Sequence, residues 1–212
     1  MVNYSRKLFT IGHSNHQINY FIELLRFAKI DCVVDVRSTP ASKYNPQFNM
    51  ETLKTSLSNV DIIYMHFGDE FGARHRNPEL WDDDGIVDFS KVQKTRAFQN
   101  GVERIDIGLS KGFNIALMCS EGNPLECHRF SMVSSYLVED GFEVEHILKN
   151  KTLVPHDQLL SELEKKYAKK IEQPSLFQPE ESSSSVKVQI NRLHNKEIGW
   201  STNENKLTQS YD

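Results

Sequence analysis

The chain has 212 residues, a hydrophobic fraction of 38% and a formal net charge of -4 at pH 7. This length suits one domain of about 150 to 200 residues with a tail, and such a domain needs no disulfide or metal to hold its core. The net charge excludes a basic surface over the whole chain, so contact with nucleic acid would require a local patch.

The three cysteines do not suggest a disulfide framework, which indicates a reducing compartment. The apolar run in the N-terminal "MVNYSRKLFTIGHSN" is too short for the core of a signal peptide. No segment approaches the roughly 18 apolar residues of a membrane span. We therefore expect a cytoplasmic protein that does not contact membranes.

Short apolar segments alternate with amphipathic segments along most of the chain. The pattern predicts strands over 7–14, 32–38, 61–68, 113–120 and 142–148, and helices over 18–30, 50–60, 91–112 and 128–141. In the first helix Phe21, Leu24, Leu25 and Ala28 share one face, and Asn19 is the expected N-cap. Continuous apolar strands that alternate with helices predict an α/β fold, a mostly parallel sheet of about five strands with helices on both faces.

After about residue 170 the chain becomes rich in Pro, Ser, Asn and Gln. We therefore divide it into an α/β domain over 1–170 and a low-complexity, mostly disordered tail over 171–212. Near the start of the tail, "QPSLF" resembles the short motif by which bacterial replication and repair proteins bind the sliding clamp, with Gln173, Leu176 and Phe177 as contacts. The alternative is that Leu176 and Phe177 pack onto the domain's own surface.

Polar groups follow four of the predicted strands. The carboxyl ends of parallel strands meet at the edge where α/β proteins bind ligands, so we expect these groups to converge. They are Gly12, His13 and Ser14 after the first strand, Arg37, Ser38 and Tyr44 after the second, Glu70 after the third, and Cys119, Glu121, Cys127, His128 and Arg129 after the fourth.

Arg37 is expected to be solvated at this rim and to bind a phosphate or carboxylate, with Ser38 and Tyr44 lining the same pocket. The alternative for Arg37 is a salt bridge to Asp35. His13 is either an acid, base or donor to an anion, or a structural histidine bonded to backbone. The turn at Gly12 and Ser14 is expected to point backbone N–H groups at a ligand.

The segment "LMCSEGNPLECHRF" allows three interpretations. Cys119 would be a nucleophile, because a thiolate near Arg129 and a helix N-terminus has a lowered pKa. A metal site would use Cys119, Cys127, His128 and His13, but the spacing fits no standard zinc pattern, so we predict no metal. In the third interpretation Arg129 and the helix N-terminus bind an anion and the cysteines pack as small hydrophobes.

Glu121 fits a purely structural role poorly. A carboxylate at such a rim suits a general base, or a nucleophile at an anomeric carbon. The sequence does not identify a cofactor.

The segments "TIGHSN", "VVDVRSTPASKYNPQF", "YMHFGDEFG" and "LMCSEGNPLECHRF" look like the domain-of-unknown-function family 488, over roughly residues 7 to 150. The resemblance implies a Rossmann-like α/β fold. Through a label that some members carry, it also implies an association with DNA repair. It implies no established reaction. The family's pattern carries over to Gly12, His13, Ser14, Asp35, Arg37, Cys119, Glu121, Cys127, His128 and Arg129.

Two functions remain open from the sequence. One is an enzyme for a nucleotide or nucleic acid, with cleavage or transfer at a glycosidic bond as the specific reaction and Glu121, Cys119 and His13 as catalytic candidates. The other is a non-catalytic module that binds such a phosphate-bearing ligand. Catalysis requires Glu121 or Cys119 to face the same cavity as Arg37.

Overall fold

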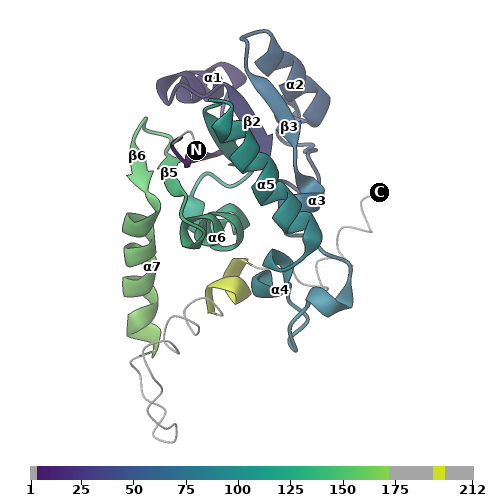
Figure 1. Cartoon of the computed structure of the whole chain (residues 1–212), viewed down its shortest axis with the longest axis vertical. Coiled ribbons are helices and arrows are strands. Elements are labelled where there is room, and N and C mark those ends of the chain that lie inside the picture. Colours follow the sequence, from purple (N-terminus) through teal and green to yellow (C-terminus); the bar gives the residue numbers. More distant parts are fainter. Residues whose placement is uncertain (1–3, 172–192, 199–212) are drawn as a thin grey trace, which may run out of the picture.

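The computed structural model describes residues 4–171 and 193–198, and it places six strands in one sheet (Figure 1). The strand order is β3-β2-β4-β1-β5-β6. Strands β1 (Lys7–Gly12), β2 (Cys32–Asp35), β3 (Ile63–His66), β4 (Ile115–Cys119) and β5 (Glu143–Ile147) are parallel, and β6 (Leu153–Pro155) runs antiparallel to β5. The predicted α/β fold is confirmed. The expected five strands omitted β6, because three residues are too few to show a period.

Successive strand residues face two separate hydrophobic cores, as the two-residue period of a strand requires. Val34 and Leu117 lie in the core beneath α5 (Arg96–Ser110) and α6 (Ser135–Glu139). Val33 and Met118 lie in the core beneath α1 (Ile18–Phe27) and α2 (Met50–Ser58). Helices therefore cover both faces of the sheet, as predicted, and α7 (His156–Ile171) packs beside β5 and β6 (Figure 1).

Two local predictions were wrong. The expected helix over 91–112 is divided into α4 (Phe89–Gln93) and α5, because the Thr95 hydroxyl accepts a hydrogen bond from the Phe98 N–H and caps a new helix. Helix α1 begins at Ile18 after Gln17, so Asn19 is not its N-cap. The apolar face of α1 is confirmed, since Phe21, Leu24, Leu25 and Ala28 are all buried.

The chain after β4 forms an unusual helix. A 3-10 turn at Pro124–Glu126 leads to a π-helical segment at Arg129–Ser134, and α6 continues from it. The Ser134 hydroxyl donates to the Arg129 carbonyl at 2.7 Å, and the Ser135 hydroxyl donates to the Phe130 carbonyl at 3.1 Å. Such wide turns are rare and often occur at functional sites. This one begins directly after Cys127 and His128.

The predicted low-complexity tail contains a short helix over residues 193–198, which rests on the domain. His194 is 2% exposed; its Nε2 donates to the Leu125 carbonyl at 2.6 Å and its Nδ1 accepts from the Ser131 hydroxyl at 2.8 Å. The prediction of a mostly disordered tail missed this helix, because its contacts are to distant residues. The predicted clamp motif, Gln173 to Phe177, lies outside the described residues. Within the described ranges, no helix has the length and apolarity to cross a bilayer.

Candidate functional site

The sheet order brings three loops together at one edge. Strand β4 lies between β1 and β2, so the segments that follow all three strands meet at their carboxyl ends. The N–H groups of His13 and Ser14 donate to the carbonyls of Cys119 and Ser120 at 2.9 and 2.8 Å. The expectation that these N–H groups face a ligand is therefore wrong, because they join the end of β1 to the end of β4.

Gly12 allows a close approach between β1 and the loop after β4. A Cβ atom at position 12 would lie 1.8 Å from the carbonyl oxygen of Glu121, closer than any side chain tolerates. The absence of a side chain at Gly12 thus places the Glu121 backbone directly against the end of β1.

A cavity of about 240 Å³ opens at this edge. Arg37, Cys119 and Glu121 all line it, so the arrangement that catalysis requires is present. A neighbouring cavity of about 400 Å³ is lined by His13 and Ser14 among others. Both cavities share four lining residues, which are Thr39, Arg74, Ser120 and Glu121.

Arg37 is held in a buried ion pair at the wall of the first cavity. Its side chain is 4% exposed, and its Nε and Nη2 donate to the two carboxylate oxygens of Asp35 at 2.8 and 2.5 Å. Nη2 also donates to the Phe48 carbonyl, and the Tyr64 hydroxyl donates to Asp35 at 2.7 Å. The expectation of a solvated Arg37 is wrong, because the fully buried Asp35 requires a compensating charge.

His13 is 2% exposed and stacks on Phe48, with the ring centroids 4.3 Å apart. Its Nδ1 lies 2.7 Å from the Ser14 carbonyl and its Nε2 lies 3.2 Å from Nη1 of Arg37. Because the carbonyl can only accept and the guanidinium can only donate, these partners assign the proton to Nδ1. Burial lowers the pKa of His13 to about 4, so the ring is neutral at pH 7 and orients Arg37.

Arg129 binds the loop backbone. Its side chain is fully buried, and its Nη1 and Nη2 donate to the carbonyls of Glu121 and Gly122 at 2.6 and 3.3 Å. It lines neither cavity. In this structure its guanidinium thus fixes the position of Glu121 and does not reach the cavity where an anion would sit.

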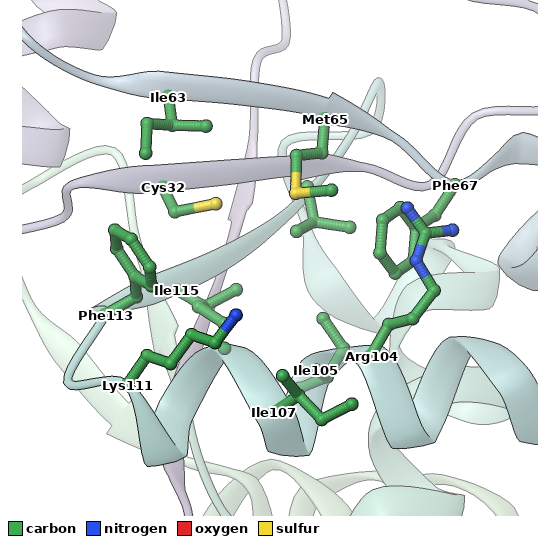
Figure 2. Close-up of a pocket in the computed structure, with 12 residues that line it drawn as sticks. Cys32, Ile63, Met65, Phe67, Arg104, Ile105, Ile107, Lys111, Phe113 and Ile115 are labelled. Carbon is green, nitrogen blue, oxygen red and sulfur yellow. The ribbon is translucent and has the colours of Figure 1, made fainter.

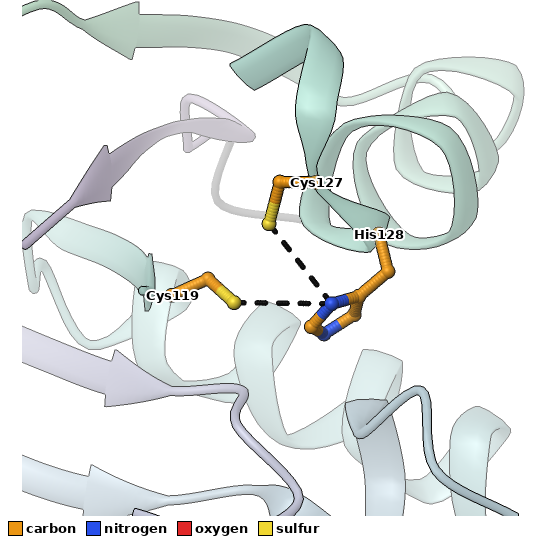
Figure 3. Close-up of side chains that lie close together, drawn as sticks. All are labelled: Cys119, Cys127 and His128. Atoms are coloured by element: carbon orange, nitrogen blue, oxygen red, sulfur yellow. Dashed lines mark hydrogen bonds between the residues drawn. The ribbon is translucent and has the colours of Figure 1, made fainter. Parts of the chain in front are cut away.

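Cys119, Cys127 and His128 form a compact cluster beside the cavity (Figure 3). Nδ1 of His128 lies 3.8 Å from Sγ of Cys119 and 3.9 Å from Sγ of Cys127. Among the described residues this is the one group whose side-chain atoms could jointly hold a metal ion. Both thiols are buried, at 3% and 1% exposure.

The two thiols differ in acidity. Burial alone would raise the pKa of Cys127, but the adjacent Cys119 thiol and the charges of Arg129 and His128 outweigh it and hold that pKa well below its usual value. Burial and the neighbouring Cys127 raise the pKa of Cys119 well above its usual value. The more acidic thiol is therefore Cys127, whereas the nucleophile named in one of the three interpretations of the sequence is Cys119.

Glu121 is exposed as a residue, yet its carboxylate turns inward and accepts a hydrogen bond from the Cys119 thiol at 3.1 Å. Partial desolvation is the main cause that raises the pKa of Glu121, and the negative charge at Cys127 adds to it. A carboxyl of raised pKa that faces a cavity can exchange protons with a bound substrate.

The remaining predicted residues divide between cavity and surface. Ser38 lines the first cavity, and its hydroxyl accepts a hydrogen bond from the Arg74 N–H at 3.0 Å. Tyr44 is 95% exposed and Glu70 pairs with Arg104; neither lines either of the two cavities at this edge. The prediction that Tyr44 lines the same pocket as Arg37 is therefore wrong.

Sequence reasoning missed several residues of the two cavities. Thr39, Ser42 and Asn45 lie in the polar loop after β2. They could have been predicted from the sequence, because they closely follow Arg37 at the end of that strand. Glu197 and Ile198, from the helix over 193–198, also line the first cavity. They had no signal in the sequence, because their place there depends on the docking of a distant segment.

A separate groove of about 240 Å³ lies between α5 and the strands β2, β3 and β4 (Figure 2). It is mainly apolar, with Ile63, Met65 and Ile107 exposed to solvent, and it shares no lining residue with the other two cavities. Its thiol, Cys32, has a pKa raised by burial to about 11. The groove therefore lacks the reactive groups of the strand-end site.

Among curated proteins and among solved structures, nothing matches the chain. The sequence model described as "Domain of unknown function DUF488" matches residues 17–137, which is more than half of the chain. The matched region begins after Gly12, His13 and Ser14 and includes the loops after β2 and β4. With Arg37, Cys119, Glu121 and the Cys127–His128–Arg129 run inside that region, the chain belongs to the DUF488 family.

Proposed function

We propose that the protein is an enzyme that acts on a phosphate-bearing substrate, a nucleotide or a nucleic acid. The observation that carries this proposal is that Arg37, Cys119 and Glu121 line one cavity at the carboxyl ends of parallel strands. The three cysteines of the protein are buried free thiols, which fits an enzyme that acts in the reducing cytoplasm.

Glu121 is the catalytic group in this proposal, because its raised pKa suits proton transfer. The reaction we favour is cleavage or transfer at a glycosidic bond, for which enzymes commonly use two carboxyl groups. Glu197 also lines this cavity and is the candidate for the second carboxyl group; its Oε2 accepts hydrogen bonds from Tyr167 and Lys166.

The anion contact falls mainly to Arg74 in this proposal. Arg74 is exposed and lines both cavities, whereas Arg37 is buried against Asp35 and Arg129 lines neither cavity. Hydroxyl groups of Ser38, Thr39 and Ser120 lie along the same wall. A guanidinium beside several hydroxyls is a suitable setting for phosphate oxygens.

The test begins with a thermal-shift screen of the full chain against nucleotides, nucleosides and short nucleic acids. A ligand at about 100 times its dissociation constant should stabilise the fold by about 2.7 kcal/mol. Each compound that shifts Tm is then incubated with the protein, and products are identified by mass spectrometry. Arg74→Ala should weaken binding, whereas Arg76→Ala, an exposed arginine outside both cavities, should not.

Catalysis is tested with a second matched pair. Glu121→Gln should retain binding and lose product formation, whereas Glu126→Gln, an exposed carboxylate of the same loop, should keep both. Binding with no product in the wild type would instead favour the alternative, a non-catalytic nucleotide- or nucleic-acid-binding module. No shift with any phosphate compound would contradict both functions, and a DNA-repair association would then depend on the tail motif alone.

A further inference from the structure

We propose that Cys119, Cys127 and His128 bind one divalent transition-metal ion of the zinc class, with a fourth coordination position open to the cavity. The three ligand atoms lie within 4.8 Å of one another (Figure 3). The site is independent of the substrate class proposed above.

The distances are close to those of a tetrahedral site. Zinc–sulfur bonds of about 2.3 Å and zinc–nitrogen bonds of about 2.0 Å place the sulfur and nitrogen ligands about 3.5 Å apart. The observed distances from Nδ1 of His128 to the two sulfurs are 3.8 and 3.9 Å. The two sulfurs lie within 4.8 Å of each other, against about 3.8 Å in a tetrahedral site, so binding of the ion would draw the three ligands closer together.

The imidazole is oriented for ligation. Nε2 of His128 lies 3.2 Å from the Val36 carbonyl, which can only accept a hydrogen bond. Nε2 therefore carries a proton, and Nδ1 is the ring nitrogen that faces both sulfurs. A metal ion would take the place of a proton on Nδ1. A histidine that ligates a metal almost always donates its other N–H to a carbonyl or carboxylate in this way.

The sulfur of Cys127 has an outer contact as well, since the Arg129 N–H donates to it at 3.4 Å. Packing of two cysteines as small hydrophobes would not explain why Nδ1 of one imidazole faces both sulfurs. The sequence spacing gave no zinc pattern because one ligand ends β4 and the other two lie at the start of the following helix. The sheet and the loop anchored by Arg129 bring them together.

Three protein ligands with an open fourth position are typical of catalytic metal sites, and four protein ligands of structural sites. Cys119 and His128 line the cavity, and the Glu121 carboxylate lies 3.1 Å from the Cys119 sulfur. A water molecule on the ion would have a lowered pKa, and Glu121 is placed to accept its proton. Zinc deaminases of nucleobases use the same donor types with a glutamate that is not a ligand.

The experiment uses the full chain, purified with a reducing agent and without added metal. Metal content is measured by plasma mass spectrometry, and zinc affinity by competition with a chromophoric chelator. We expect one zinc ion per chain at saturation. Co²⁺ should bind the same site and produce a thiolate-to-cobalt charge-transfer absorption, which reports sulfur ligation directly in the wild-type protein.

Substitutions identify the ligands. Cys119→Ser, Cys127→Ser and His128→Gln should each lower zinc affinity by more than about 100-fold, because even outer contacts of metal sites contribute about 10- to 100-fold. The matched control is Cys32→Ser, which removes the third buried cysteine from β2 and should retain wild-type affinity. Circular dichroism establishes that each variant is folded.

Two results would overturn the proposal. One is binding of less than one ion per chain with no charge-transfer absorption in wild-type protein, a measurement that needs no variant. The other is equal zinc affinity in Cys127→Ser and Cys32→Ser. Glu121→Gln removes only an outer contact of Cys119 and should lower zinc affinity by less than Cys119→Ser does; an equal loss would contradict the three-ligand assignment. The zinc measurements contain no nucleotide, so their outcome does not decide whether the protein is an enzyme. That proposal is tested separately by the ligand screen and product analysis.

Discussion

Replacement of Arg37 by alanine should destabilise the protein strongly. The Asp35–Arg37 pair is buried, with side-chain exposures of 0% and 4%, so the substitution leaves a carboxylate in the core without its counter-charge. Loss of one partner of a buried ion pair costs about 3–5 kcal/mol of unfolding free energy. We expect the lower end, about 3 kcal/mol, because Asp35 keeps the Tyr64 hydroxyl at 2.7 Å and the backbone N–H of residue 37 at 3.1 Å.

The measurement is urea unfolding at pH 7, with the free energy extrapolated to zero denaturant. Glu23→Ala is the control. It removes a surface pair with Lys151, whose side chains are 55% and 43% exposed, and should cost less than about 1 kcal/mol. A double-mutant cycle with Asp35→Asn adds a second criterion. The double variant should lose less stability than the sum of the two single variants, because neither partner is then left charged and alone.

An equal and small loss in Arg37→Ala and Glu23→Ala would refute this reasoning. It would mean that water reaches Asp35 and that the ion pair is effectively at the surface. Additive losses in the double-mutant cycle would lead to the same conclusion.

Three further predictions concern other parts of the molecule. Gly12→Ala should cost about 3 kcal/mol through overpacking, because its Cβ would lie 1.8 Å from the Glu121 carbonyl, whereas Gly122→Ala meets Ser14 at 3.3 Å and should lower Tm far less. Burial lowers the pKa of His13 to about 4 in the folded protein, whereas an imidazole in the unfolded chain titrates near about 6.5. Between these two pH values the unfolded chain binds more protons than the folded protein. The stability that depends on a neutral His13 is therefore complete above about pH 6.5 and is lost as pH falls. Between pH 7 and pH 5 the wild type should lose about 2 kcal/mol more stability than His13→Asn, and equal slopes in urea unfolding would contradict burial of the ring. A fluorescent peptide over residues 170 to 180 should bind bacterial sliding clamp at micromolar concentration and lose binding when Leu176 and Phe177 become alanine; no binding up to about millimolar clamp, about 4 kcal/mol of affinity, would exclude the motif.

The sequence alone determined the α/β class and the strand-end location of the candidate site. Both follow from local patterns: continuous apolar runs mark buried parallel strands, and the polar groups after them lie at the carboxyl edge. Ser38, Cys119 and Glu121 line the cavity at this edge for that reason. The buried face of α1 was predictable from the same kind of period, whereas a strand as short as β6 leaves no period to detect.

The tertiary structure decided what each group at that edge does. The sequence placed Arg37 and Arg129 near the rim, but only the packed fold shows that one balances Asp35 and the other binds the carbonyls of the Glu121 loop. The convergence of Cys119, Cys127 and His128 likewise depends on where a strand and a helix meet, and the cavity wall includes Glu197 from a distant segment. Local periodicity shows which faces are apolar. The desolvation, charge pairing and close backbone contacts at this edge arise between residues far apart in the chain.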